Sequence, residues 1–220
     1  MPHNLTILAF DTSAAHCAAA LLRGGGIVAG RRETMAKGQA ERLFPLLEDV
    51  LAEAATEWDA LDAVAVGAGP GNFTGIRIAV SAARGLALSL GIPAVGVSCL
   101  EAQAEGLGRP VVSSLTAPRR QVWAEVLGPP GSPPALMDPG AINLDISPRA
   151  EVRCVGAFAE VIALQLAGRA VDPAMPLAEG IARIAARRIS AGVPLPRPVP
   201  LYLRSADALP ATDPPPVILP

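Results

Sequence analysis

Residues 67–77 read Gly67-Ala68-Gly69-Pro70-Gly71-Asn72-Phe73-Thr74-Gly75-Ile76-Arg77. A short apolar run at 63–66 precedes this stretch, and a long alanine-rich segment of helical character follows it. A strand, a glycine turn and a helix in that order point free backbone N–H groups at an anion. The four glycines also let the backbone take positive φ angles and approach another surface closely. The stretch therefore predicts a loop that contacts a phosphorylated ligand or another chain, and the alternative is a tight turn that packs helix against strand.

This glycine loop matches neither of the common phosphate-binding motifs. A P-loop ends in Gly-Lys-Ser/Thr, whereas this loop ends in Thr74-Gly75-Ile76. The dinucleotide fingerprint G-x-G-x-x-G fails as well, because its last place is Asn72 when counted from Gly67 and Thr74 when counted from Gly69. The loop alone leaves its binding and packing interpretations equally open.

The composition sets limits on the class of protein. Of the 220 residues, 51% are hydrophobic but only 3% are aromatic, so the core is expected to consist of Ala, Val, Leu and Ile. A net charge of −2 argues against stand-alone nucleic-acid binding. Cys17, Cys99 and Cys154 are odd in number and far apart, which indicates reduced thiols in a cytoplasmic protein. We expect no signal peptide and no membrane-spanning stretch.

Hydrophobic periodicity predicts an α/β chain in two units. In the first unit we expect strands at 5–10, 17–22, 27–33, 63–66 and 94–97, the first three as an antiparallel meander, and helices at about 39–54 and 74–90. A short helix starts at Cys99, with Ser98 and Glu101 at capping-box spacing. In the second unit we expect strands at 111–115, 122–127 and 152–155, helices near 158–166 and 177–189, and an extended, proline-dense tail after Pro194.

Few residues have the chemistry for catalysis. The only histidines are His3 and His16, which excludes a three-histidine metal site. Asp11 follows a buried strand and either faces a site or forms a local Asx turn. A relay of Asp11, His16 and Cys17 is the weaker alternative to structural roles for these residues. Arg77 opposes the dipole of the helix that it begins, so it is better placed facing an anion or a partner's carboxylate than in solvent.

Several motifs occur in an order that resembles a known family. They are ILAFDTS at 7–13, ERLFPL at 41–46, GPGNFTGIR at 69–77, GLA at 85–87, GVSCLE at 96–101 and PLYLR at 200–204. This set is similar to the bacterial TsaB family, also called YeaZ, whose members have been labelled glycoproteases or M22-like peptidase homologues. The resemblance is strong over about the first 105 residues and weak beyond them.

The resemblance implies an actin-like/Hsp70-like (ASKHA) α/β fold of two RNase-H-like lobes, which we place at 1–107 and 108–220. It implies a role in making N6-threonylcarbamoyladenosine at position 37 of tRNAs that read ANN codons. The implied partners are a catalytic TsaD-type paralogue and a small ATPase of TsaE type, with tRNA contacted indirectly through the complex and a homodimer formed in isolation. The implied location is the cytoplasm.

The resemblance also bears on the site. The catalytic paralogue binds a metal with two histidines of a His-Met-Glu-Gly-His run, and Cys99 and Gln103 stand in those places when the runs are aligned on Glu101. Neither a catalytic residue nor a metal ligand is therefore assigned, and ATP or ADP at a subunit junction is left open as a cofactor. The predicted phosphate-binding or interface loop comprises Asp11, Thr12, Ser13, Gly69, Gly71, Thr74, Gly75 and Arg77. The predicted partner interface comprises Leu43, Leu47, Ile76, Val80 and Ala83.

Two enzymatic alternatives stand beside the non-catalytic subunit. A small actin-like ATPase or kinase would use Asp11, Thr12, Ser13 and the glycine loop on phosphates. A peptidase has weaker support, because the sequence contains neither a zinc-binding motif nor a clear triad.

Overall fold

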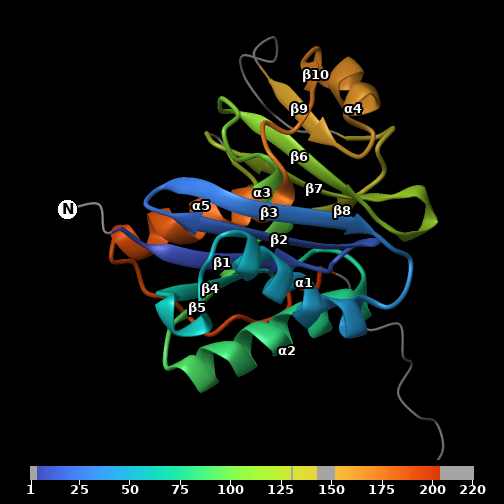
Figure 1. The fold of residues 1–220 in the computed structure, drawn as a ribbon. Coiled ribbons are helices and arrows are strands. Elements are labelled where there is room, and N and C mark those ends of the chain that lie inside the picture. The colour runs from blue at the N-terminus through green and yellow to red at the C-terminus, as the bar shows by residue number, and fades with distance from the viewer. Residues whose placement is uncertain (1–3, 130, 143–151, 204–220) are drawn as a thin grey trace, which may run out of the picture.

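Two five-stranded sheets form the framework of the computed structural model, which describes residues 4–129, 131–142 and 152–203 (Figure 1). The strands of the first sheet are β1 (Thr6–Asp11), β2 (His16–Arg23), β3 (Gly26–Thr34), β4 (Ala63–Gly67) and β5 (Ala94–Val97). The strands of the second sheet are β6 (Val111–Thr116), β7 (Val122–Leu127), β8 (Ala135–Met137), β9 (Arg153–Gly156) and β10 (Arg169–Val171).

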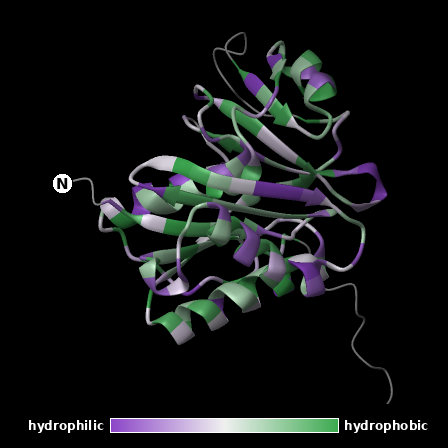
Figure 2. Cartoon of the chain, viewed as in Figure 1, coloured by the Kyte–Doolittle hydropathy of each residue, from purple (hydrophilic) through white to green (hydrophobic). Residues whose placement is uncertain are grey.

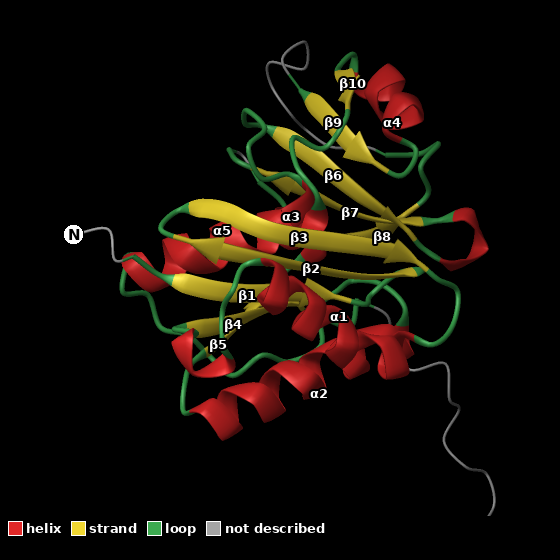
Figure 3. Cartoon of the chain, in the orientation of Figure 1, coloured by secondary structure: helices red, strands yellow, loops and turns green. Residues whose placement is uncertain are grey.

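Helices connect and cover these sheets (Figure 3). They are α1 (Gln39–Glu53), α2 (Phe73–Leu90), α3 (Cys99–Gln103), α4 (Ala159–Leu166) and α5 (Leu177–Ser190), with short 3₁₀ turns at Trp58–Ala60 and Pro118–Arg120. The predicted strands and helices are confirmed to within about two residues at each end, which is the usual uncertainty of such boundaries.

The two sheets share one topology. In the first, β1, β2 and β3 form an antiparallel meander, and β4 and β5 run parallel to β1. In the second, β6, β7 and β8 form the meander, and β9 and β10 run parallel to β6. Both sheets therefore have the strand order third, second, first, fourth, fifth. The fold repeats one supersecondary plan twice.

Around β1 the first sheet is buried on both faces, whereas the edge strand β3 is mostly exposed, and strand alternation divides the buried side chains between the two faces. Leu8 and Phe10 of β1 point toward α1 and α2, whereas Ile7 and Ala9 point toward α5. Small and branched aliphatic residues dominate both layers, as the composition predicts. The result is a three-layer α/β/α arrangement around β1.

The helix that comes after each sheet in the chain packs against the other sheet. Helix α3 follows the first sheet and contacts β6 and β7, whereas α5 follows the second sheet and packs against β1 and β2. The two helices also contact each other. The division of the chain at 107 and 108 stays a prediction, because a helix from the second half of the sequence completes the core of the first sheet.

Helix α2 meets the length and hydropathy criteria of a membrane-spanning helix, and it is the one helix within the described ranges that does so. This criterion is weak evidence, because core helices of globular domains satisfy it too. Here 28% of the helix is buried against the protein, and the opposite side contains Arg77, Ser81 and Gly85, all of them exposed. Helix α2 is therefore amphipathic in this fold.

The residues predicted for a partner interface lie in the core. Leu43 and Leu47 of α1 and Ile76, Val80 and Ala83 of α2 are at most 2% exposed and pack between these helices and the first sheet. The helical period turns this apolar stripe toward the sheet. This corrects the prediction, because only the opposite sides of α1 and α2 can contact a partner.

The predicted capping box at α3 does not form. Ser98 is the N-cap residue, but its hydroxyl makes no capping hydrogen bond and has no partner among the described residues. The N–H of Cys99 instead donates to the carbonyl of Gly69 at 2.8 Å, and the carboxylate of Glu101 pairs with Arg188 at 2.5 Å. Tertiary contacts have replaced the local ones at this short helix.

Two glycines of α2 provide a matched test of this packing. A Cβ on Gly75 would clash with the carbonyl oxygen of Thr12, whereas a Cβ on Gly85 would meet no atom within 4 Å. We expect Gly75→Ala to lower the free energy of unfolding by about 1–3 kcal/mol through overpacking. Gly85→Ala should raise it by about 1 kcal/mol through helix propensity. Denaturant titration measures both changes, and equal effects of the two substitutions would contradict the packing.

Candidate functional site: a buried aspartate under the glycine loop

The carboxylate of Asp11 lies at the end of β1 and is fully buried. Its Oδ2 accepts hydrogen bonds from the backbone N–H of Ser13 at 3.0 Å and from the Ser13 hydroxyl at 2.9 Å. The Nε2 atom of His16 lies 2.7 Å from the same oxygen. The bond to the Ser13 N–H forms an Asx turn. Of the two roles predicted for Asp11, facing a site or forming a local turn, the structure contains the local turn.

The second carboxylate oxygen faces the end of β4 and the start of α3. Oδ1 of Asp11 lies 3.5 Å from the thiol of Cys99, which also lies 3.4 Å from the Ser13 hydroxyl. A side chain at Gly67 would clash with this oxygen. Since an ionised carboxylate offers about four acceptor positions, protein groups already occupy those of Asp11.

The glycine loop packs directly on the turn that follows β1. The N–H of Asn72 donates to the carbonyl of Ser13 at 2.6 Å, and the Thr12 hydroxyl donates to the carbonyl of Gly75 at 2.7 Å. A Cβ on Gly71 would clash with Ser13. The predicted residues of the loop and the turn are thus brought together, and they use their polar groups on each other.

The start of α2 has its own cap, which the sequence reasoning missed. Asn72 is the N-cap residue, and its side chain accepts a hydrogen bond from the N–H of Gly75 at 3.0 Å. Asparagine is among the preferred N-cap residues, so residue type could have identified it. Thr74 is exposed beside this cap. Gly69 lies close to the Ile76 side chain and to the carbonyl of Leu201.

Arg77 contacts two aromatic residues, and among the described residues it pairs with no carboxylate. Its Nε donates to the hydroxyl of Tyr202 at 2.8 Å, and its guanidinium carbon lies 3.8 Å from the centre of the Phe73 ring. The Phe73 and Tyr202 rings stack with centroids 5.2 Å apart. Sequence reasoning missed both aromatic residues, because no local pattern connects positions 73 and 202.

The two positions aligned with metal-ligating histidines make internal contacts. Cys99 faces Asp11, as described above. The side-chain amide of Gln103 donates to the Ser113 hydroxyl and the Ser114 carbonyl, both at 3.1 Å, and so ties α3 to β6. In the described part of the chain no three His, Cys, Asp or Glu side chains gather as they would around a metal ion.

Among the described residues near Asp11, no nucleophile that lies beside a base is accessible to a substrate. Cys17 packs in the core between the first sheet and α1, and His16 faces Asp11, so the relay of Asp11, His16 and Cys17 is absent. The Ser13 hydroxyl and the Cys99 thiol both approach a carboxylate, and both residues are buried. An activated nucleophile needs a neighbouring base and access to substrate, and these two groups have no access.

The repeated sheet topology, with the turn after β1 and the glycine loop at their junction, defines a two-lobed α/β protein of the actin-like (ASKHA) class. A structure of the ethanolamine utilization protein EutJ from Carboxydothermus hydrogenoformans, 16% identical, matches with a TM-score of 0.53 and supports the fold alone. The superposition covers 80% of this chain and 88% of the EutJ chain.

Closer comparisons identify the family. The family model for TsaD, tRNA N6-adenosine threonylcarbamoyltransferase, matches residues 15–124. An uncharacterized protein from Mycobacterium tuberculosis is 35% identical over 93% of this chain and 94% of its own length. The tRNA threonylcarbamoyladenosine biosynthesis protein TsaB from Escherichia coli is 36% identical over 55% of this chain and 54% of its own. The structure of YeaZ from Pseudomonas aeruginosa, 28% identical, superposes with a TM-score of 0.74 over 90% of this chain and 100% of that one. The chain belongs to the TsaB (YeaZ) family.

The buried thiols give a direct test of the site. Burial raises the pKa of Cys17 and of Cys154 to about 11, and burial with the nearby Asp11 charge raises the pKa of Cys99 well above its usual value. The reactive thiolate is therefore scarce at neutral pH. We expect the folded protein at pH 8 to react slowly with a disulfide reagent, and all three thiols to react after unfolding. An exposed cysteine introduced by Ser89→Cys on α2 is the control. Rapid modification of native Cys99 would contradict this account.

Proposed function

We propose that this chain is a non-catalytic subunit in the biosynthesis of tRNA threonylcarbamoyladenosine and acts by binding a TsaD-type catalytic paralogue. Membership of the TsaB family supports the pathway. The internal use of Asp11, Cys99 and Gln103 supports a role without catalysis of its own, because the groups at the ancestral site are committed to packing and hydrogen bonds.

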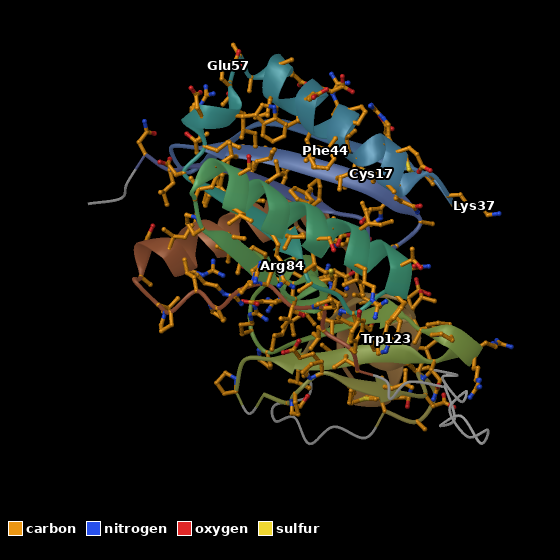
Figure 4. The ribbon with its side chains drawn as sticks, turned by 90° about the horizontal axis from the view of Figure 1, so that it is seen from below. Cys17, Lys37, Phe44, Glu57, Arg84 and Trp123 are labelled. Carbon is orange, nitrogen blue, oxygen red and sulfur yellow. The ribbon has the colours of Figure 1, made fainter. Side chains whose placement is uncertain are left out.

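The docking role rests on the outer face of α1 and α2, which is the side of the two helices that points away from the first sheet. Figure 4 shows the two helices side by side on one side of the molecule, with Phe44 and Arg84 labelled on them. Leu88 of α2 is 81% exposed. Ser81 and Gly85 are exposed on the same helix, and because both residues are small, the helix surface there is flat. A flat helix with small side chains lets another helix approach closely, and an exposed leucine gains apolar burial on contact.

The two helices of this face carry opposite charge. Helix α1 has four acidic residues and one basic residue, whereas α2 has two arginines and no acidic residue. Figure 2 shows hydrophilic segments along α1, whereas α2 is mostly pale or hydrophobic. A partner that sets a basic helix on α1 and an acidic helix on α2 would be favoured. A second copy related by a two-fold axis satisfies this by placing α1 against α2, which accounts for a homodimer in isolation.

The remaining assignments follow from the same proposal. A small ATPase of TsaE type joins the pair, and tRNA binds to the assembled complex, while ATP or ADP at a subunit junction stays an open alternative. The location is the cytoplasm, where tRNA is modified and where three free, buried cysteines stay reduced.

Two equally exposed leucines provide the test. We expect Leu88→Arg to abolish co-purification and co-elution with the catalytic paralogue, because it removes the apolar contact from the outer face of α2 and puts a long charged side chain in its place. Leu164, 85% exposed on α4 of the second sheet, is the matched position, and Leu164→Arg should leave pairing intact. Size-exclusion chromatography with light scattering measures the complex. Unchanged pairing of the Leu88 variant would exclude α2 as the docking helix.

A further inference from the structure

Two aromatic rings and a guanidinium form an exposed cluster where the tail crosses the start of α2. The chain has only four Phe, two Trp and one Tyr. Two of these seven residues, Phe73 at 53% exposure and Tyr202 at 45%, meet on the surface although 129 positions separate them in the chain. The aliphatic core does not require this pairing. The two exposed rings therefore offer a surface that another molecule can contact.

The cluster is flat and cationic. The ring planes of Phe73 and Tyr202 differ by 28°, and the Arg77 guanidinium lies over the Phe73 ring. The Nε of Arg77 is held by the Tyr202 hydroxyl, which fixes the orientation of the guanidinium. No hydrogen bond or ion pair within the described residues engages its two Nη groups. An oriented guanidinium with free Nη groups matches the geometry of a phosphate.

The tail is fixed on both sides of Tyr202. The N–H of Leu201 donates to the carbonyl of Ala68 in the glycine loop at 2.7 Å. Leu203 packs in a cluster with Leu100 of α3 and with Ala117 and Trp123 of the second sheet. The Tyr202 ring is therefore preorganised, which reduces the entropy that a ligand must overcome on binding.

The surroundings of the cluster are basic. Helix α2 has no acidic residue. Leu203 packs against the cluster that includes Ala117, the residue before the turn between β6 and β7, and this turn presents the exposed residues Arg119 and Arg120. Figure 1 shows this turn and the first turn of α2 at the same end of the molecule. Several separated cations suit a chain of phosphates better than a single carboxylate.

We propose that Phe73, Arg77 and Tyr202 form a contact site for single-stranded RNA. An unpaired base stacks on the exposed aromatic surface, and the Nη groups of Arg77 bind a flanking phosphate. This inference rests on the proposed function, because it assigns to this subunit a direct contact with the RNA on which the complex acts. With a net charge of −2 the isolated chain binds weakly, and the contact contributes mainly within the complex.

The single tyrosine makes the contact observable in the isolated chain. Incorporation of 3-fluorotyrosine gives one ¹⁹F resonance, from position 202. We expect an RNA hairpin with a single-stranded loop to shift this resonance in a saturable way, and its fully paired counterpart and inorganic polyphosphate to shift it little. No shift with the hairpin would overturn the proposal, as would an equal shift with polyphosphate, which would indicate an anion site without stacking.

Substitutions then separate the ring from the charge. Loss of one base–aromatic stack should weaken hairpin binding by the complex about five- to a hundredfold, so we expect this loss for Phe73→Leu and Tyr202→Leu. Tyr202→Phe keeps the ring but releases the Nε of Arg77, so it should weaken binding less than Tyr202→Leu does. Arg77→Gln should reduce the salt dependence of binding by about one phosphate contact. Phe158→Leu, at an exposed ring in the turn between β9 and α4, is the control.

Pairing with the catalytic paralogue is measured on the same variants. Weaker RNA binding with unchanged pairing supports the contact. Loss of pairing by Phe73→Leu and Tyr202→Leu would assign the cluster to a protein interface and overturn the RNA contact while sustaining the docking role. If the parent chain fails to pair, the proposed function fails, and the ¹⁹F titration still decides the RNA contact.

Discussion

The rest of the structure depends on the contact between two pieces of backbone, the turn after β1 and the glycine loop before α2. Gly71 and Gly75 are required there because any side chain would meet the backbone of Ser13 or Thr12. The buried carboxylate of Asp11 fixes the shape of the turn by accepting hydrogen bonds from the backbone N–H and the hydroxyl of Ser13. Burying a carboxylate is costly unless it is fully hydrogen-bonded. The donors from Ser13 and His16 offset that cost and hold one conformation of the turn.

This contact positions α2, and α2 positions the surfaces on which the proposed function depends. The helix starts at the Asn72 cap, directly above the Asp11 turn, and its buried side packs on the first sheet. Its direction is therefore set at one end by backbone contacts and along its length by aliphatic packing. The outer face, from Phe73 to Leu88, is presented as a rigid surface, and a rigid surface loses little entropy when a partner binds.

Much of this fold could be predicted from the sequence, because hydrophobic period and glycine placement are local signals. The meander over β1 to β3 and the strand, loop and helix around residues 67–77 were predicted on such signals. The interface residues were placed wrongly, because Leu43 and Val80 mark the apolar side of a helix, and that side faced the sheet. The Asp11 to Cys99 contact and the Arg77 to Tyr202 bond join residues 88 and 125 positions apart. Contacts of that range are decided by topology, which no short motif reveals.

The same residues show how the polar groups beneath the glycine loop are used within the chain. An ionised aspartate repels phosphate unless a cation lies between them, and here the positions around Asp11 are occupied by a hydroxyl, an imidazole and a thiol. Gln103 uses its amide to join α3 to β6, so it connects the helix that follows the first sheet to the second sheet. The side chains of Asp11, Ser13, His16 and Gln103 are thus hydrogen-bonded within the chain. These contacts stabilise the start of α2, the helix on which the proposed docking face lies.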